Sequence, residues 1–208
     1  MIAIVDYGMG NLRSVQKAFE QAGAQARVVT TAKELSAAQK IVLPGVGAFA
    51  DAIERLRSQG LAEPLVHAAR QGVPFLGICL GVQLMFDVSY EDGEYAGLGI
   101  FAGKVIRFDF DSLPPARRQG LRIPHMGWNG LSWNRPCPLF EGIEKGAYTY
   151  FAHSYYVQPA DSGIACTTTE YGYPFTSSVW KDNVFGTQFH PEKSQAVGLA
   201  MLRNFVRL

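Results

Sequence analysis

The first half of the chain alternates between short apolar runs and segments whose apolar residues recur three or four positions apart. The runs are rich in β-branched residues and predict strands at residues 2–7, 26–29, 40–45 and 73–78. The periodic segments predict helices at residues 11–23, 31–35, 48–58 and 61–71. Because strand and helix alternate, we expect a parallel sheet with right-handed crossovers and helices on both faces.

The second half consists of shorter aromatic and β-branched segments separated by turn residues. They predict strands at residues 103–110, 127–133, 148–158, 164–172, 175–181 and 183–190. The chain closes with an amphipathic segment at 195–208, which predicts a helix capped by Ser194. We therefore expect one α/β domain over residues 1–208, with a central mixed, mostly parallel sheet flanked by helices and extended by antiparallel strands.

Composition narrows the class of protein. Hydrophobic residues make up 48% of the 208 residues and charged residues 18%, which is ample material for a core. A formal net charge of +1 argues against nucleic-acid binding through a broad basic surface. No apolar run approaches membrane-spanning length, and the first residues do not resemble a secretory signal.

The chain has three cysteines, Cys79, Cys137 and Cys166, with no C-x-x-C spacing. An odd number without that spacing predicts neither a disulfide framework nor a cysteine-rich zinc site. We therefore expect no metal and no cofactor, and a reducing cytoplasm is the simplest compartment.

Cys79 lies between Gly77 and Gly81 in the stretch PFLGICLGVQLMF, where a predicted strand gives way to an amphipathic run. A G-x-nucleophile-x-G turn holds its central residue in a strained conformation above the sheet, and glycines avoid Cβ clashes there. The helix that follows favours a thiolate, and the Leu80 amide can donate to an oxyanion. A buried small residue in a glycine-rich turn is the alternative, but we interpret Cys79 as a nucleophile.

His190 is the best candidate among four histidines for the base that this nucleophile needs. The stretch VFGTQFHPEKS predicts a strand that ends in His-Pro-Glu. Because residues two apart on a strand face the same way, Glu192 is expected to reach His190 and orient its imidazole. Taken alone, the segment fits a strand-end histidine beside a solvated glutamate equally well.

A second oxyanion donor is expected from the glycine turn LPGVGAF, residues 43–49. The amides of Val46 and Gly47 could project toward the Cys79 turn, and glycine on both sides of Val46 would let its peptide plane reorient. An ordinary strand-to-helix loop is the alternative interpretation.

GICLGVQ and HPE together resemble the class I, triad-type, glutamine amidotransferases, and the resemblance covers essentially the whole chain. DYGMGNLRSV, LPGVGAF, PHMGWN, YFAHSYY and GTQFHPEKSQ are similar to the branch of this family that serves imidazole glycerol phosphate synthase in histidine biosynthesis. The resemblance implies that Cys79 attacks the carboxamide of L-glutamine, that His190 transfers protons and that Glu192 orients His190. It also implies an oxyanion hole formed by the amides of Val46 and Leu80.

Further roles follow from the same resemblance. The residues implied to contact the glutamine are Gln83, Glu91, His153, Ser154 and Tyr155. The implied partner is a (β/α)8-barrel cyclase subunit, which receives ammonia and forms a heterodimer with the chain. The stretch RIPHMGWNG is a candidate for docking on it: His125, Met126 and Trp128 are expected to form an aromatic–sulfur cluster, flanked by Pro124 and Asn129. A local core between loop and sheet is the alternative for this stretch.

Two other classes of function stay open. A peptidase or thioesterase could use the same cysteine turn, although Gln83 in an amide pocket argues against it. A non-catalytic regulatory subunit is the other class, and the intact set of Cys79, His190 and Glu192 argues against that. Within the amidotransferases, a glutaminase that serves another synthase is the nearest alternative.

Overall fold

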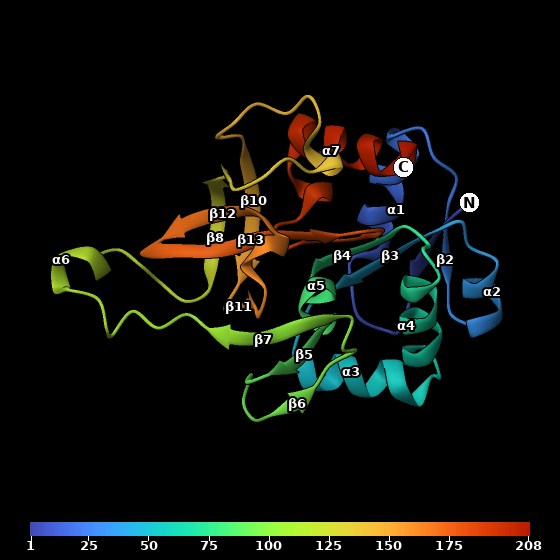
Figure 1. The fold of residues 1–208 in the computed structure, drawn as a ribbon, viewed down its shortest axis with the longest axis horizontal. Coiled ribbons are helices and arrows are strands. Elements are labelled where there is room, and N and C mark those ends of the chain that lie inside the picture. Colours follow the sequence, from blue (N-terminus) through green and yellow to red (C-terminus); the bar gives the residue numbers. More distant parts are fainter.

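The computed structural model describes residues 1–208, and its centre is an eight-stranded mixed sheet (Figure 1). The strand order is β2-β1-β3-β4-β14-β13-β12-β9. The five strands from β2 to β14 are parallel, and the remaining neighbours are antiparallel, as the sequence predicts. The bounds are β1 (Ile2–Val5), β2 (Ala26–Val29), β3 (Lys40–Gly45), β4 (Phe75–Cys79), β9 (Ser132–Trp133), β12 (Ala165–Tyr171), β13 (Tyr173–Lys181) and β14 (Val184–Thr187).

Two smaller sheets stand beside the central one, and the sequence did not predict this division. One has the order β11-β7-β5-β6, and the other pairs β10 with β8. The predicted strand at 148–158 is wrong in one respect: it breaks at Ser154, and its halves join different sheets. The bounds are β5 (Phe86–Ser89), β6 (Tyr95–Ala96), β7 (Phe101–Arg107), β8 (His125–Gly130), β10 (Tyr148–His153) and β11 (Tyr155–Pro159).

Helices cover both faces of the central sheet (Figure 1). α1 (Leu12–Gln21) and α7 (Gln195–Arg207) pack on one face. The other face carries α2 (Ala32–Ser36), α3 (Phe49–Ser58), α4 (Ala62–Arg70) and α5 (Leu80–Leu84). A short α6 (Pro115–Arg118) lies on an excursion away from the sheet, and the 3-10 turns are η1 (Pro138–Phe140), η2 (Ser162–Ile164) and η3 (Pro191–Lys193). None of the helices has the length and apolar character needed to cross a membrane.

The core follows from the alternation of side chains along buried parallel strands. In β3, Ile41 and Leu43 join the core under α2–α5, whereas Val42 joins the core under α1 and α7. Phe19 of α1 and Phe205 of α7 meet edge to face, with ring centroids 6.0 Å apart. Each is fully buried, and burial of such a side chain stabilises the fold by about 1.5–3 kcal/mol.

The carboxyl ends of three neighbouring parallel strands meet at one edge of the sheet. Gly45 at the end of β3 pairs with Cys79 at the end of β4, and Thr187 at the end of β14 pairs with Ile78. Loops that follow such strand ends form the usual ligand-binding edge of an open α/β sheet. The three candidate segments, around Val46, Cys79 and His190, are thereby brought together.

Candidate active site

The turn at Cys79 is strained and depends on its flanking glycines, as predicted. Cys79 has φ 54° and ψ −111°, a conformation that a residue with a side chain rarely adopts. A Cβ on Gly81 would lie 1.8 Å from the Leu43 carbonyl oxygen, and a Cβ on Gly77 would lie 2.4 Å from the Met85 sulfur. No larger residue fits at either position without moving the backbone or the core.

Two polar groups contact the sulfur of Cys79. Its thiol donates to the carbonyl oxygen of Ala152 at 3.8 Å, and Nε2 of Gln188 donates to Sγ at 3.7 Å. Gln188 is fully buried and was not predicted as a site residue. The sequence carried no local signal for this contact, because β14 ends at Thr187 and Gln188 lies in the bend that follows it.

His190 and Glu192 form a buried pair beside Cys79. Nδ1 of His190 donates to Oε1 of Glu192 at 2.8 Å, which leaves Nε2 for the sulfur. Burial disfavours the imidazolium, but the adjacent Cys79 and the Glu192 carboxylate outweigh burial and raise the pKa of His190 to about 10. The predicted contact is present, but its predicted reason was wrong: β14 ends at Thr187, and the two residues meet through the 3-10 turn η3.

The turn η3 is held in place by α7 and by Ser194. Ser194 Oγ donates to the carbonyl oxygen of His190 at 2.6 Å. A Cβ on Gly198 of α7 would lie 1.9 Å from the carbonyl oxygen of Pro191, so only glycine allows this close approach. Ser194 occupies the N-cap position of α7, as expected, but its side chain makes no capping bond because it is committed to His190.

Cys79 opens into a cavity of about 220 Å³. All the predicted oxyanion and glutamine-contact residues line it, together with two residues of the predicted docking stretch. The lining comprises Val46, Gly47, Cys79, Leu80, Gln83, Glu91, Pro124, Met126, Ala152, His153, Ser154 and Tyr155. The walls of the cavity present both amide and carboxylate groups.

The loop at Val46 differs from expectation in the role of its glycines. A Cβ on Gly45 would lie 2.5 Å from the hydroxyl of Tyr7 and 2.9 Å from Cβ of Leu80, so Gly45 is required for packing rather than for freedom of rotation. Gly47, with φ +102°, has the backbone conformation that favours glycine. The buried Tyr7 donates to the carbonyl oxygen of Pro44 at 2.9 Å, and burial together with Cys79 raises its pKa.

Gln83 and Glu91 present polar groups to the cavity from different elements. Nε2 of Gln83, on α5, donates to the carbonyl oxygen of Tyr155 at 2.9 Å and to Oε1 of Gln188 at 3.2 Å. Glu91 accepts the amide hydrogen of Phe49, at the start of α3, at 2.9 Å. Burial raises the pKa of the Glu91 carboxyl, against the lowering effect of that hydrogen bond.

The docking stretch divides between two faces of β8, so the predicted cluster of His125, Met126 and Trp128 does not form. Met126 and Trp128 are 64% and 45% exposed, and Trp128 packs edge to face on Tyr150. His125 is buried and stacks on Tyr171 with ring centroids 3.9 Å apart. The local-core alternative is correct for His125, whereas Met126 and Trp128 are available to a partner.

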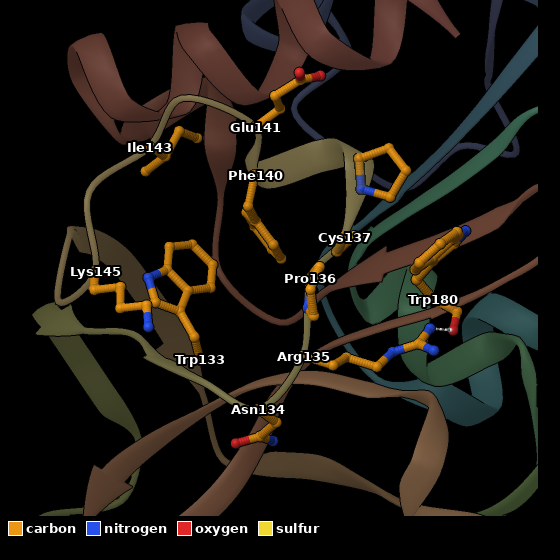
Figure 2. Close-up of a pocket in the computed structure, with 11 residues that line it drawn as sticks. Trp133, Asn134, Arg135, Pro136, Cys137, Phe140, Glu141, Ile143, Lys145 and Trp180 are labelled. Carbon is orange, nitrogen blue, oxygen red and sulfur yellow. Dashed lines mark hydrogen bonds between the residues drawn. The ribbon is translucent and has the colours of Figure 1, made fainter.

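A larger hollow of about 670 Å³ lies elsewhere, between β9 and η1 (Figure 2). Trp133, Phe140 and Trp180 line it, and the Arg135 guanidinium lies over the Trp180 ring at 4.6 Å. None of its lining residues lines the Cys79 cavity. It contains Cys137 but no histidine, so it lacks the paired nucleophile and base found at Cys79.

Comparison with known proteins agrees with this geometry. Residues 3–208 match the family model of class I glutamine amidotransferases. The imidazole glycerol phosphate synthase subunit HisH of Syntrophotalea carbinolica is 52% identical over 207 residues, which cover 99% of this chain and 98% of that protein. The subunit of the same name from Geobacter sulfurreducens is also 52% identical, with 98% and 97% covered.

Solved structures agree on the fold. The structure of PurLQS from Thermotoga maritima has a TM-score of 0.76 at 20% identity and covers 99% of this chain and 97% of that chain. A crystal structure of a glutamine amidotransferase has a TM-score of 0.75 at 18% identity, with 100% and 98% covered. The family model matches nearly the whole length of this chain, and the two relatives are identical to it at about half of their positions. The chain therefore belongs to the class I glutamine amidotransferase family.

Proposed function

We propose that the chain, as a single domain over residues 1–208, hydrolyses L-glutamine to glutamate and ammonia and passes the ammonia to a (β/α)8-barrel cyclase subunit in the cytoplasm. The cyclase uses it to make imidazole glycerol phosphate for histidine biosynthesis. The observation that carries the proposal is the strained Cys79 turn beside the buried His190–Glu192 pair. The names of the relatives supply the choice of synthase.

The reaction begins when the Cys79 thiol passes its proton to His190, which leaves a thiolate beside an imidazolium. The sulfur attacks the side-chain carbonyl carbon of glutamine, and the carbonyl oxygen takes up the negative charge. The amides of Val46 and Leu80, both on residues that line the cavity, donate to that oxyanion. As the C–N bond breaks, His190 gives its proton to the leaving nitrogen, so ammonia departs and a thioester is left on Cys79.

The second half of the reaction reverses the proton transfers. His190, now neutral, takes a proton from water, and the resulting hydroxide adds to the thioester carbon. The C–S bond then breaks, which releases glutamate and restores the thiolate and the imidazolium. Glu192 holds the ring through Nδ1 in both halves, so Nε2 always faces the reacting atoms.

The cavity walls hold the rest of the glutamine. Glu91 supplies a carboxylate for the α-ammonium group, and Gln83 supplies a carboxamide. The segment 153–155 contacts the amino-acid end of the substrate, since all three residues line the cavity. A volume of about 220 Å³ suits a single small amino acid better than a peptide, which favours glutamine over a protease substrate.

Direct transfer explains why a partner is needed. Ammonia released into water becomes ammonium, which is not a nucleophile, so the cavity must open onto a partner rather than onto solvent. Pro124 and Met126 line the cavity, and Met126 and Trp128 are exposed on the same face of β8. A partner that docks on this face covers the Cys79 cavity and receives the ammonia.

The test is co-purification of the chain from native extract, followed by an assay of glutamine hydrolysis with and without the recovered partner. We expect a barrel-type cyclase as the partner and glutamate production that rises when it is present. If a different synthase is recovered as the partner, the assignment to histidine biosynthesis is wrong. If the chain hydrolyses thioesters or peptides in place of glutamine, the whole proposal is overturned.

A further inference from the structure

Two buried histidines outside the triad face each other across the paired strands β8 and β10. His125 and His153 are 3% and 6% exposed and occupy opposed positions in the strand register. Nδ1 of His125 lies 3.0 Å from Nε2 of His153. Phe108, Phe151, Phe175 and Tyr171 surround the pair, and neither ring makes a salt bridge with a carboxylate.

The direction of hydrogen bonding is fixed at one end of this pair by Asn129. Oδ1 of Asn129 accepts the amide hydrogen of Gly130 at 2.8 Å, so its Nδ2 must point the other way. Nδ2 donates to the carbonyl oxygen of Glu170 at 2.9 Å and to Nε2 of His125 at 3.3 Å. Nε2 of His125 is therefore an acceptor, and its Nδ1 carries the proton.

The other end gives the same direction independently. Nδ1 of His153 lies 2.8 Å from the carbonyl oxygen of Tyr155, which can only accept, so Nδ1 carries the proton. Nε2 of His153 then accepts from Nδ1 of His125. Burial lowers the pKa of His125 to about 4 and that of His153 to about 3, which keeps both rings neutral at pH 7.

The chain of hydrogen bonds continues into the cavity. The Tyr155 carbonyl that accepts from His153 also accepts from Nε2 of Gln83, whose second hydrogen goes to Gln188. Both Nε2 hydrogens of Gln83 are thus committed, and Oε1 is its only polar atom without a protein partner. Because Gln83 lines the cavity, this oxygen is the acceptor that it offers to a ligand.

We propose that Asn129 is a positioning residue: through His125 and His153 it holds the Tyr155 carbonyl and the Gln83 carboxamide so that Oε1 of Gln83 accepts an N–H group of the substrate. The identity of that substrate as glutamine rests on the proposed function. With the opposite tautomers, the Nδ1 lone pair of His153 would face the Tyr155 carbonyl at 2.8 Å and displace this wall of the cavity.

The first test needs no substrate. Nitrogen-15 NMR of the imidazoles at pH 7 should show both His125 and His153 neutral and protonated on Nδ1. A proton on Nε2 of either ring, or a charged ring, would overturn the proposal. Because this measurement does not depend on turnover, a chain without glutaminase activity would refute the proposed function but leave the tautomers decided.

The second test replaces the donor by an acceptor of the same size, Asn129→Asp. The carboxylate should force a proton onto Nε2 of His125, visible in the same spectrum, and should raise KM for glutamine about tenfold, the cost of one hydrogen bond. The kcat and the rate of Cys79 alkylation by iodoacetamide should change by less than about threefold, because the triad is untouched. Glu170→Gln, whose exposed side chain lies outside the chain of bonds, is the matched control and should change nothing.

Loss of kcat with KM unchanged, or imidazole signals unaffected by Asn129→Asp, would overturn the positioning role. Should Asn129→Asp melt below assay temperature, Asn129→Ser keeps a short hydroxyl donor without the charge. It should retain the Nδ1 tautomers and show a smaller rise in KM. If KM for Asn129→Ser were as high as for Asn129→Asp while its Nδ1 tautomers were retained, that result would also count against the proposal.

Discussion

Nδ1 of His190 lies 2.8 Å from Oε1 of Glu192, and both side chains are almost completely excluded from solvent. Both Cys79 and Glu192 raise the pKa of His190, and Cys79 has the larger effect. We therefore expect His190→Ala to lower glutaminase kcat by about 10²–10⁴-fold, since it removes proton transfer. Glu192→Gln keeps a neutral acceptor at Nδ1 and should cost roughly tenfold, the difference between a charged and a neutral hydrogen bond.

Glutamine turnover by the two variants, each shown to be folded by its thermal melt, checks this ranking. Equal losses would mean that Glu192 does more than orient the ring. Oε2 of Glu192 is buried and makes no hydrogen bond, so an additional role for that oxygen is the first explanation that such a result would suggest.

Cys79 should be the one cysteine that a glutamine-like electrophile labels stoichiometrically. All three cysteines are free and buried, but only Cys79 lines the small cavity and has a histidine beside it. The neighbouring Cys166 thiol and burial raise the pKa of Cys137, which keeps Cys137 as an unreactive thiol. Mass spectrometry of the labelled chain locates the adduct, and His190→Ala is the control that should slow it.

Equal labelling of Cys79 and Cys137 would argue against the nucleophile assignment. Cys137 is a fair comparison, because it lines the larger hollow in Figure 2 and is therefore within reach of a small reagent. If the reagent labels Cys79 and not Cys137, the difference therefore reflects the chemistry of the Cys79 turn rather than access alone.

The histidines of β8 and β10 should make the protein less stable in acid. Their pKa values, about 4 and about 3 in the folded chain, lie below the ordinary value of 6.5. Their stabilising contribution is complete above pH 6.5 and falls as the pH drops toward 4, because the unfolded chain binds protons that the folded chain excludes. Each should add about 1.4 kcal/mol per pH unit to the slope of unfolding free energy in that window.

Urea unfolding from pH 7 to pH 5 measures this slope. His125→Gln should lower the slope by the share of one histidine, and the same change at the exposed His67 should leave it as in the wild type. Carboxylates contribute equally to all three proteins and cancel in the comparison. Parallel slopes in wild type and His125→Gln would contradict the prediction.

The parallel half of the fold was predictable because its signals are local. Fully buried strands and helices with periodic apolar positions appear directly in the sequence. The Thr31–Glu34 capping box at the start of α2 likewise joins residues only three positions apart. The antiparallel half was predicted less well, because partner choice depends on distant residues. The break at Ser154 separates two segments of similar composition, and β5 begins only two residues after α5 ends, so it was hidden in one amphipathic run.

The candidate site shows the same division between local and distant information. Cys79, with its glycines, is recognisable from five consecutive residues, and His190 and Glu192 from three. Gln188 was not predicted, because its contact with the Cys79 sulfur depends on the pairing of β4 with β14. The hydrogen bond between His125 and His153 arises only when β8 pairs with β10, which no local pattern reveals.

Trp128→Ala should weaken partner association more than it lowers the stability of the isolated chain. Trp128 is 45% exposed and packs on Tyr150 alone among the aromatic residues, so its removal leaves no core cavity. A large aromatic at the centre of an interface typically contributes about 2 kcal/mol or more to binding. Calorimetric titration with the cyclase and thermal melts of the free chain separate the effects, and His125→Ala, on the buried face of β8, should show the reverse pattern.

Cys79→Ala separates the alternative functions in a single reconstitution with the cyclase. The sulfur is needed only to release ammonia from an amide through a covalent intermediate, whereas the cyclase consumes ammonia from any source. Glutamine-dependent synthesis should therefore disappear, and synthesis from added ammonium salts at elevated pH should persist.

A non-catalytic regulator would keep the glutamine-driven reaction after the substitution. If the chain were a peptidase or thioesterase, no synthase activity would depend on it. Because alanine also lacks the freedom of glycine at φ 54°, a melt of the variant must first show a folded chain that still binds the cyclase. With docking intact, loss of both reactions would show that Cys79 serves the assembled complex in some way other than as the nucleophile.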